Sequence, residues 1–260
     1  MEIYYIVTFF IFGIVFGSFF NVVGYRLPRG ESIINPPSKC PKCDHQLSSK
    51  ELIPIFSYLI QKGKCRNCQA PIPPYYAFFE LFTGFLFALS YYTFGFTNEL
   101  PIALLFSSMA IILIVSDYHF YIIPDEVLIF SIITIMSLIV INNGFLELSY
   151  SLINAIIAFA SILTIKLFGD FIFKKESMGG GDIKLLFVFG LIIGWEMAIL
   201  AIILGAFIGL PVALFLMINK KIKERIIPFG PFLCVAALVL YFTQYDVEKF
   251  IDFLLKIRIF

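Results

Sequence analysis

Charged residues are scarce in this sequence. Asp, Glu, Lys and Arg make up only 14% of its 260 residues, whereas 60% are hydrophobic and the mean hydropathy is +0.94. A soluble domain of this size does not need many apolar runs of about 20 residues, the length that crosses the hydrocarbon core of a bilayer. The composition therefore excludes an ordinary soluble protein and predicts an all-α, polytopic membrane protein surrounded by lipid.

Two further features are missing. The sequence has no basic stripe of the kind that nucleic-acid binding requires, so we expect no nucleic-acid partner. The first apolar stretch, residues 3–23, has no basic segment before it and no small-residue cleavage site after it. Such a stretch is expected to stay in the membrane rather than to be removed as a signal peptide.

Apolar windows predict about eight transmembrane helices. They lie at roughly 3–23, 77–96, 101–118, 126–143, 148–168, 183–194, 197–217 and 229–245. The resulting domain prediction is a first transmembrane helix at 1–23, a cytoplasmic loop at 24–76, a seven-helix membrane domain at 77–245 and a tail at 246–260.

The distribution of Lys and Arg predicts the orientation. They gather in the segments 24–76, 166–184 and 219–227, and are absent from the short loops at 97–100, 144–147 and 195–196. Because basic loops stay on the cytoplasmic side, we expect these three segments in the cytoplasm and both termini outside.

Four cysteines of the loop at 24–76 form two C-x2-C pairs, Cys40 with Cys43 and Cys65 with Cys68. Each pair offers two thiolates on one tight turn, and two pairs close a tetrahedron around Zn²⁺. A disulfide framework is the alternative, and it is disfavoured on the reducing side of a membrane. We expect a structural zinc site, which can supply the folding energy of a loop without its own core, and we expect His45 to be a bystander.

Two acids border apolar spans. Asp182 lies in Met178-Gly-Gly-Gly-Asp-Ile-Lys184, directly before one span, and Asp117 closes another. Acids at a bilayer boundary usually face a protein interior or a wet cavity, so these two are candidates for a catalytic pair that shares one proton. The alternative is that Asp182 caps a helix and that Asp117 is solvated in a loop.

Other polar residues accompany this pair. Asp125 is expected to cap the helix that follows it, His119 to be a polar loop residue, and Lys184 to be a charge neighbour of Asp182 or a cytoplasmic marker. Glu80 falls inside a predicted span, where a buried acid needs a partner.

Six blocks of residues occur in one order along positions 17–231. They are Gly17-Ser18-Phe19-Phe20-Asn21 with Tyr25-Arg26-Leu27-Pro28, the two cysteine pairs, Glu80-Leu81 with Thr83-Gly84, Asp117 with Ile123-Pro124-Asp125, Gly179-Gly180-Gly181-Asp182-Ile183-Lys184, and Pro228-Phe229-Gly230-Pro231. In this order they resemble the bacterial type IV prepilin peptidases, membrane aspartic proteases of the G-x-G-D class. The resemblance covers most of the chain.

The resemblance implies a function. Members of this family cut the basic leader from type IV prepilins or pseudopilins at the cytoplasmic membrane face, and many then methylate the new amino terminus with S-adenosylmethionine. By this likeness Asp117 and Asp182 are the catalytic pair, and Gly179, Gly181, Asp125 and Lys184 are accessory. The four cysteines match the members that also methylate.

Glu80 and Gly84 match a region that the family associates with methyl transfer. No G-x-G-x-x-G turn is present to hold the methyl donor, so its site must be built from the zinc loop and nearby spans. Gly180 departs from the family, because many relatives carry a larger residue there.

Two other classes of function are compatible with parts of the sequence. A proton-coupled transporter could use the same acids, although both lie near one face and the spans show no evident inverted repeat. A non-enzymatic scaffold could recruit a partner through its zinc knuckles. The sequence does not give the oligomeric state.

Overall fold

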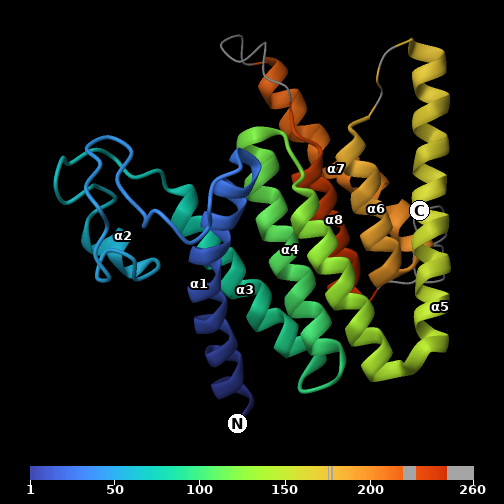
Figure 1. Cartoon of the computed structure of the whole chain (residues 1–260), viewed down its shortest axis with the longest axis horizontal. Helices are drawn as coiled ribbons and strands as arrows, with labels where there is room; N and C mark the ends of the chain where they lie inside the picture. Colours follow the sequence, from blue (N-terminus) through green and yellow to red (C-terminus); the bar gives the residue numbers. More distant parts are fainter. Residues whose placement is uncertain (175, 177, 219–226, 245–260) are drawn as a thin grey trace, which may run out of the picture. The chain divides into compact units, whose positions relative to one another are not determined.

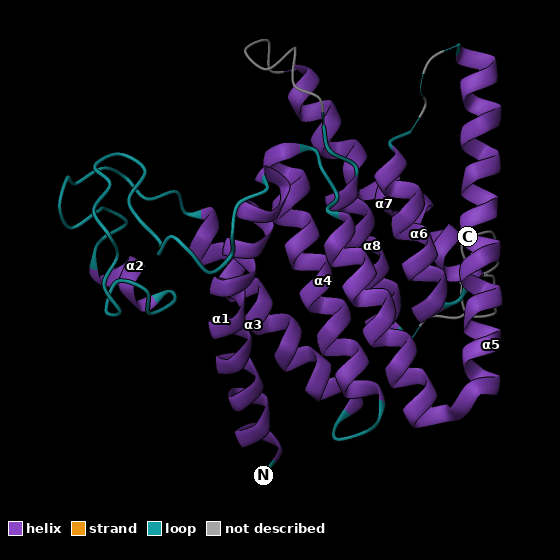
Figure 2. Cartoon of the chain, viewed as in Figure 1, coloured by secondary structure: helices purple, strands orange, loops and turns teal. Residues whose placement is uncertain are grey.

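Helices make up most of the part of the chain that the structure describes. The computed structural model describes residues 1–174, 176, 178–218 and 227–244, which contain no strand. The elements are α1 (Glu2–Arg26), η1 (Leu27–Arg29), α2 (Phe56–Ile60), α3 (Tyr75–Phe94), α4 (Glu99–Phe120), α5 (Asp125–Phe173), α6 (Gly180–Ile193), α7 (Trp195–Ile218) and α8 (Gly230–Thr243) (Figure 1 and Figure 2). The prediction of an all-α chain is confirmed. The chain divides into two compact units, Met1–His119 and Phe120–Phe260.

Close packing of α1 against α3 organises the first unit. A Cβ added at Gly13 would lie 2.6 Å from the carbonyl oxygen of Thr83, and one at Gly84 would lie 2.8 Å from Cγ1 of Ile14. Small residues at such positions let helix backbones approach closely, and van der Waals contact of this kind drives helix association in lipid. Gly24 makes a similar approach to α4, since a Cβ there would lie 2.7 Å from the carbonyl oxygen of Ile112.

The segment between α1 and α3 has little regular structure. It contains the 3-10 turn η1, the short helix α2 and two isolated β-bridges, Lys39 with Gln46 and Lys64 with Pro71. In Figure 1 this segment is the blue-to-teal excursion away from the ends of α1 and α3.

A bend at Gly144 divides α5. Gly144 has φ 86° and ψ 178°, which are not helical, within a helix of 49 residues. An unbroken helix of this length would measure about 74 Å, more than twice the roughly 30 Å of the hydrocarbon core. Figure 1 shows the chain turning back at the bend, so that the two halves of α5 run beside α6 in different directions. The predicted loop at 144–147 is reduced to this bend.

Helix α6 packs against the second half of α5, and α7 packs against α8. A Cβ at Gly190 would lie 2.8 Å from Cα of Ala155 and 2.8 Å from Cβ of Ala158, and one at Gly205 would lie 3.3 Å from Cα of Leu233. Glycine therefore sets close contacts between helices in the second unit as well.

Several helices are long and apolar enough to cross a membrane. By length and composition there are five among the described residues: Glu2–Arg29, Tyr75–Phe94, Glu99–Phe120, Asp125–Phe173 and Trp195–Leu216. Helices α6 and α8 have 14 residues each, which corresponds to about 21 Å. The chain is thus a multi-pass membrane protein. The predicted count of about eight spans is not confirmed, and the predicted tail at 246–260 lies outside the described residues.

Candidate functional site

The four loop cysteines form one cluster. The Sγ atoms of Cys40, Cys43, Cys65 and Cys68 all lie within 4.8 Å of one another. Sγ of Cys40 is 3.8 Å from that of Cys68, and Sγ of Cys43 is 3.9 Å from that of Cys65. Tetrahedral Zn²⁺ with Zn–S bonds of about 2.3 Å requires sulfur atoms about 3.8 Å apart. All four thiols are free, so the cluster fits zinc and not a disulfide framework.

The two knuckles that carry these cysteines have the same backbone geometry. The amide of Cys40 donates to the carbonyl of His45, and the amide of Cys65 donates to the carbonyl of Ala70, both at 2.9 Å. Asp44 and Gln69, four residues after the first cysteine of each knuckle, have φ values of 55° and 58°. Each knuckle is therefore a hydrogen-bonded turn that aims two thiols at the same point.

The backbone of the first knuckle favours the thiolate form of Cys40. Backbone N–H groups of Lys42 and Cys43 lower the pKa of the Cys40 thiol to about 6. Because Zn²⁺ binds the thiolate and releases its proton, a lowered thiol pKa makes metal binding easier near neutral pH.

The buried carboxylate of Glu51 stabilises the first knuckle through hydrogen bonds. Glu51 Oε2 accepts hydrogen bonds from the amide and the hydroxyl of Ser48, at 2.9 and 2.7 Å, and lies 3.3 Å from Nε2 of His45. These hydrogen bonds lower the pKa of Glu51 to about 2, and those from Ser48 contribute most. His45 contacts Glu51 and does not belong to the cysteine cluster.

Asp182 lies in the first turn of α6. Its N-cap is Gly179, so the alternative in which Asp182 caps this helix is wrong. On a helix, Asp182 shares a face with Leu186 and Phe189 at positions i+4 and i+7, and both of these are 0% exposed. A carboxylate at this end of the helix is favoured by the helix dipole. Asp182 is thus an acid on the buried side of an apolar helix.

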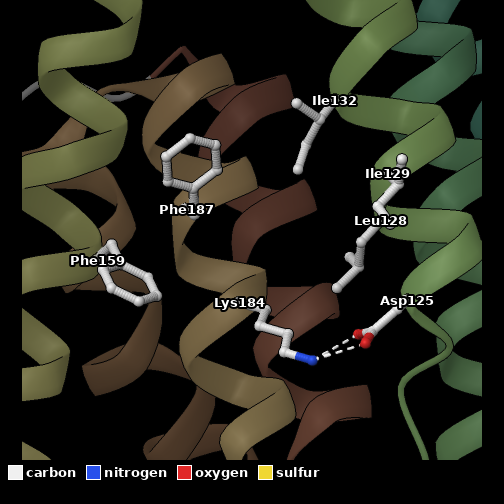
Figure 3. A pocket seen from close by; sticks show the side chains of 7 residues that line it. All are labelled: Asp125, Leu128, Ile129, Ile132, Phe159, Lys184 and Phe187. Atoms are coloured by element: carbon white, nitrogen blue, oxygen red, sulfur yellow. Dashed lines mark hydrogen bonds and ion pairs between the residues drawn. The ribbon is translucent and has the colours of Figure 1, made fainter.

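Two contacts join the start of α6 to the start of α5. A Cβ added at Gly181 would lie 3.0 Å from Cδ1 of Ile123. Nζ of Lys184 lies 2.7 and 2.8 Å from the two carboxylate oxygens of Asp125 (Figure 3). The N-cap of α5 is Pro124, with no side-chain cap, so the expectation that Asp125 caps this helix is wrong. Its carboxylate binds Lys184.

An apolar groove of about 410 Å³ opens beside this ion pair (Figure 3). It is lined by Asp125, Leu128, Ile129, Ile132, Phe159, Lys184 and Phe187. Lys184 and Phe187 are two and five residues after Asp182, which rotates them by about 200° and 140° around α6. The groove therefore faces away from Asp182, and we do not assign it to the predicted catalytic pair.

Asp117 lies in the last turns of α4 and is only 7% exposed. The alternative in which it is solvated in a loop is wrong, because the helix continues to Phe120. Asp117 belongs to the first unit and Asp182 to the second, and their predicted meeting stays a prediction.

His119 is also helical rather than a loop residue. Its ring packs on those of Tyr25, Tyr75 and Tyr118, with centroids 5.6, 4.7 and 5.0 Å away. This aromatic cluster could not be predicted from local sequence patterns, because its members come from three separate segments of the chain.

Glu80 and Gly84 lie on one face of α3, one turn apart. Glu80 is 8% exposed, and its Oε2 accepts a 2.8 Å hydrogen bond from the backbone N–H of Ile55. A Cβ at Gly84 would meet Ile14 and the carbonyl oxygen of Phe10 at 2.8 and 3.0 Å, both in α1. The buried acid therefore has one partner in the zinc loop, Ile55, and another in α1, Ser18, and the glycine is covered by α1. None of these contacts offers a cradle for a methyl donor.

Comparisons with known proteins agree along the chain. Residues 11–94 match the family described as the Bacterial Peptidase A24 N-terminal domain, and residues 104–214 match the Type IV leader peptidase family. No solved structure matches significantly.

Several relatives are named prepilin leader peptidase/N-methyltransferase. The protein of Bacillus subtilis is 35% identical over 252 residues, covering 96% of this chain and 98% of the relative. Those of Legionella pneumophila and Pseudomonas aeruginosa are 32% and 30% identical, covering 89% and 86% of this chain and 89% and 85% of the relatives.

Proposed function

Since the chain belongs to the type IV leader peptidase family, we propose that it is a membrane aspartic endopeptidase and protein N-methyltransferase. It cleaves the basic leader of type IV prepilins or pseudopilins and then methylates the new amino terminus. The observation that carries the proposal is the likeness over nearly the full length of a relative that bears both activities in its name.

Asp117 and Asp182 are the catalytic pair in this proposal. Two carboxyl groups that approach within about 3 Å share one proton, and the pair titrates as a unit. The ionised carboxylate takes a proton from water, the water oxygen attacks the scissile carbonyl carbon, and the protonated carboxyl gives its proton to the carbonyl oxygen. Supporting the assignment, Asp117 is buried, and Asp182 shares a helix face with fully buried residues.

The accessory residues of the peptidase hold Asp182 in place. Gly181 allows Ile123 to approach the first turn of α6, and Lys184 binds Asp125 at the start of α5. Gly179, the N-cap of α6, lies beside this carboxylate, since a Cβ there would be in ordinary contact with Oδ2 of Asp182 at 3.5 Å. Two contacts from neighbouring turns thus fix the helix end that carries the acid.

The zinc ion has a structural role. Cys40, Cys43, Cys65 and Cys68 hold it as four thiolates, leaving no open position for a substrate or water. Segment 27–74 lacks a regular core, so the binding free energy of the metal stabilises its fold.

Methylation requires S-adenosylmethionine, whose sulfonium supplies an electrophilic methyl group. Glu80 and Gly84 belong to the methyl-transfer half of the protein in this proposal. Since their contacts are with Ile55 and α1, they do not fit as direct ligands of the methyl donor.

The location follows from the substrate. A prepilin presents an apolar helix in the bilayer and a basic leader in the cytoplasm, so cleavage has to occur where the membrane ends. We propose that the protein lies in the inner membrane, with the zinc loop and both aspartates at the cytoplasmic side, as the basic segments indicate.

The experiment is to incubate the purified protein with a prepilin, with and without S-adenosylmethionine, and to read the product amino terminus by mass spectrometry. Cleavage should occur in both samples and methylation only in the second. Asp117→Asn and Asp182→Asn should each abolish cleavage while the protein still inserts into the membrane. Glu147→Gln is the control, because it also neutralises an acid and Glu147 is exposed in α5.

Full cleavage by either aspartate variant would refute the mechanism. A protein that shows neither cleavage nor methylation would instead be a scaffold, and transport in liposomes that depends on a pH gradient would favour a transporter.

A further inference from the structure

Glu80 connects the zinc loop to a membrane helix. Its carboxylate lies in α3 and accepts the N–H of Ile55, 25 residues earlier in the chain, at 2.8 Å. Ile55 is the N-cap of α2, the short helix that lies between the two knuckles in the sequence. The hydrogen bond therefore attaches the middle of the loop, rather than one of its ends, to the helix bundle of the first unit.

The backbone at this point of attachment is strained. Ile55 has φ 61° and ψ −54°, and a positive φ is unfavourable for a β-branched residue. Such a conformation persists only where the surroundings determine it. A carboxylate acceptor in a buried site is a strong partner for a backbone N–H, so Glu80 is well suited to hold Ile55 in this conformation.

Gly84 lies in the same helix, α3, one turn after Glu80. Its contact with Phe10 and Ile14, together with that of Gly13 with Thr83, sets the distance between α1 and α3. Because α1 precedes the zinc loop and α3 follows it, this distance also fixes the separation of the two ends of the loop.

We propose that Glu80 and Gly84 are positioning residues: Glu80 fixes the middle of the zinc loop on α3, and Gly84 fixes the helices at its two ends. They support methyl transfer by holding the loop and do not contact the methyl donor. The expected effect on methylation rests on the proposed methyltransferase function. The attachment of the zinc loop to α3 by Glu80 can be measured without any enzyme activity.

The test compares Glu80→Met with Glu80→Gln. Methionine has a similar length and no strong acceptor, while glutamine keeps an acceptor oxygen and loses the charge. Glu147→Gln is the control, since Glu147 is exposed and lies in α5. For each variant, hydrogen exchange read by mass spectrometry follows the peptide that contains Ile55, and separate assays follow zinc content, cleavage and methylation.

We expect Glu80→Met to speed exchange at Ile55 by about tenfold or more, as loss of a hydrogen bond to a charged group predicts, and to reduce methylation while zinc and cleavage are retained. Glu80→Gln should restore most of the protection and most of the methylation. Gly84→Ala provides a second variant: it should speed exchange across the loop and lower methylation with the Glu80 carboxylate still in place.

Two results would overturn the proposal. One is normal exchange at Ile55 in Glu80→Met. The other is a loss of methylation in Glu80→Gln with Ile55 still protected, which would mean that the charge itself acts in the reaction. If the unchanged protein does not methylate, the proposed methyltransferase function fails. The hydrogen-exchange data still show whether Glu80 holds the zinc loop at Ile55.

Discussion

Gly180 and Gly181 are neighbours in one motif but have different surroundings. A Cβ at Gly180 would meet nothing within 4 Å, whereas one at Gly181 would lie 3.0 to 3.2 Å from three atoms of Ile123. The free space at Gly180 leaves room for a larger residue at this position.

We predict that Gly180→Ala changes stability by less than about 0.5 kcal/mol and leaves cleavage unchanged, because its methyl group points into open space. Gly181→Ala should cost about 1–3 kcal/mol through overpacking against Ile123 and slow cleavage at least about tenfold by shifting Asp182. Thermal unfolding in detergent and cleavage rates check both. Equal behaviour of the two variants would contradict the prediction.

Glu51 gives a second prediction at this scale. Its pKa is lowered from 4.5 to about 2 by Ser48 and His45. A depressed pKa contributes stability that is complete above the unfolded value and is lost as pH falls through the folded value. The stability that Glu51 gives to the loop should therefore be full above about pH 4.5 and disappear toward about pH 2.

The measurement compares the unchanged protein with Glu51→Gln by limited proteolysis of the loop. The variant should be cut faster at neutral pH, and the difference should shrink as the pH falls below about 4.5. Glu31→Gln serves as the control, because Glu31 is exposed and pairs with Arg29. A difference that grows toward low pH would be inconsistent with a lowered pKa.

At the scale of elements, the contact of α1 with α3 depends on glycine. A Cβ at Gly13 would lie 2.6 Å from a backbone oxygen and 2.7 Å from Cα of Gly84. Backbone atoms cannot turn away as a side chain can, so the helices would have to separate.

We predict that Gly13→Ala destabilises the first unit by about 1–3 kcal/mol and loosens the zinc loop through its ends. Val15→Ala, at an exposed position of the same helix, should be nearly neutral. A disulfide cross-linking assay between α1 and α3 would read the separation. If Gly13→Ala left cross-linking unchanged, the close approach would not be required.

The sequence predicted those features that depend on local patterns. Apolar runs longer than a soluble helix predicted the membrane helices, and the C-x2-C pairs predicted the cysteine cluster, because each pair determines its own turn. It did not predict the partners of Glu80 and Lys184. Those pairs lie 25 and 59 residues apart in the chain, and only the packing of helices brings them together.

At the scale of the whole molecule, we expect the loop around the zinc cluster to unfold without any loss of the membrane helices. We predict that Cys40→Ser with Cys43→Ser releases zinc, because two ligands of four are lost, and makes the loop sensitive to protease. Binding of structural zinc is worth about 10–16 kcal/mol in small zinc domains, so the loop should unfold while the helices remain inserted.

Metal analysis and protease mapping test this prediction. Cys234→Ser is the control, since Cys234 is buried in α8 and is not part of the cluster. Zinc retained by the double variant would refute the ligand assignment.

The bend at Gly144 gives the chain a place to carry an added segment. Its φ of 86° suits glycine, and a Cβ there would meet nothing within 4 Å, so the polypeptide turns in free space. The following residues 145–147 carry no Lys or Arg, so the orientation proposed above places the turn on the outer side. An epitope inserted after Gly144 would then be reached by antibodies on spheroplasts that have not been broken open.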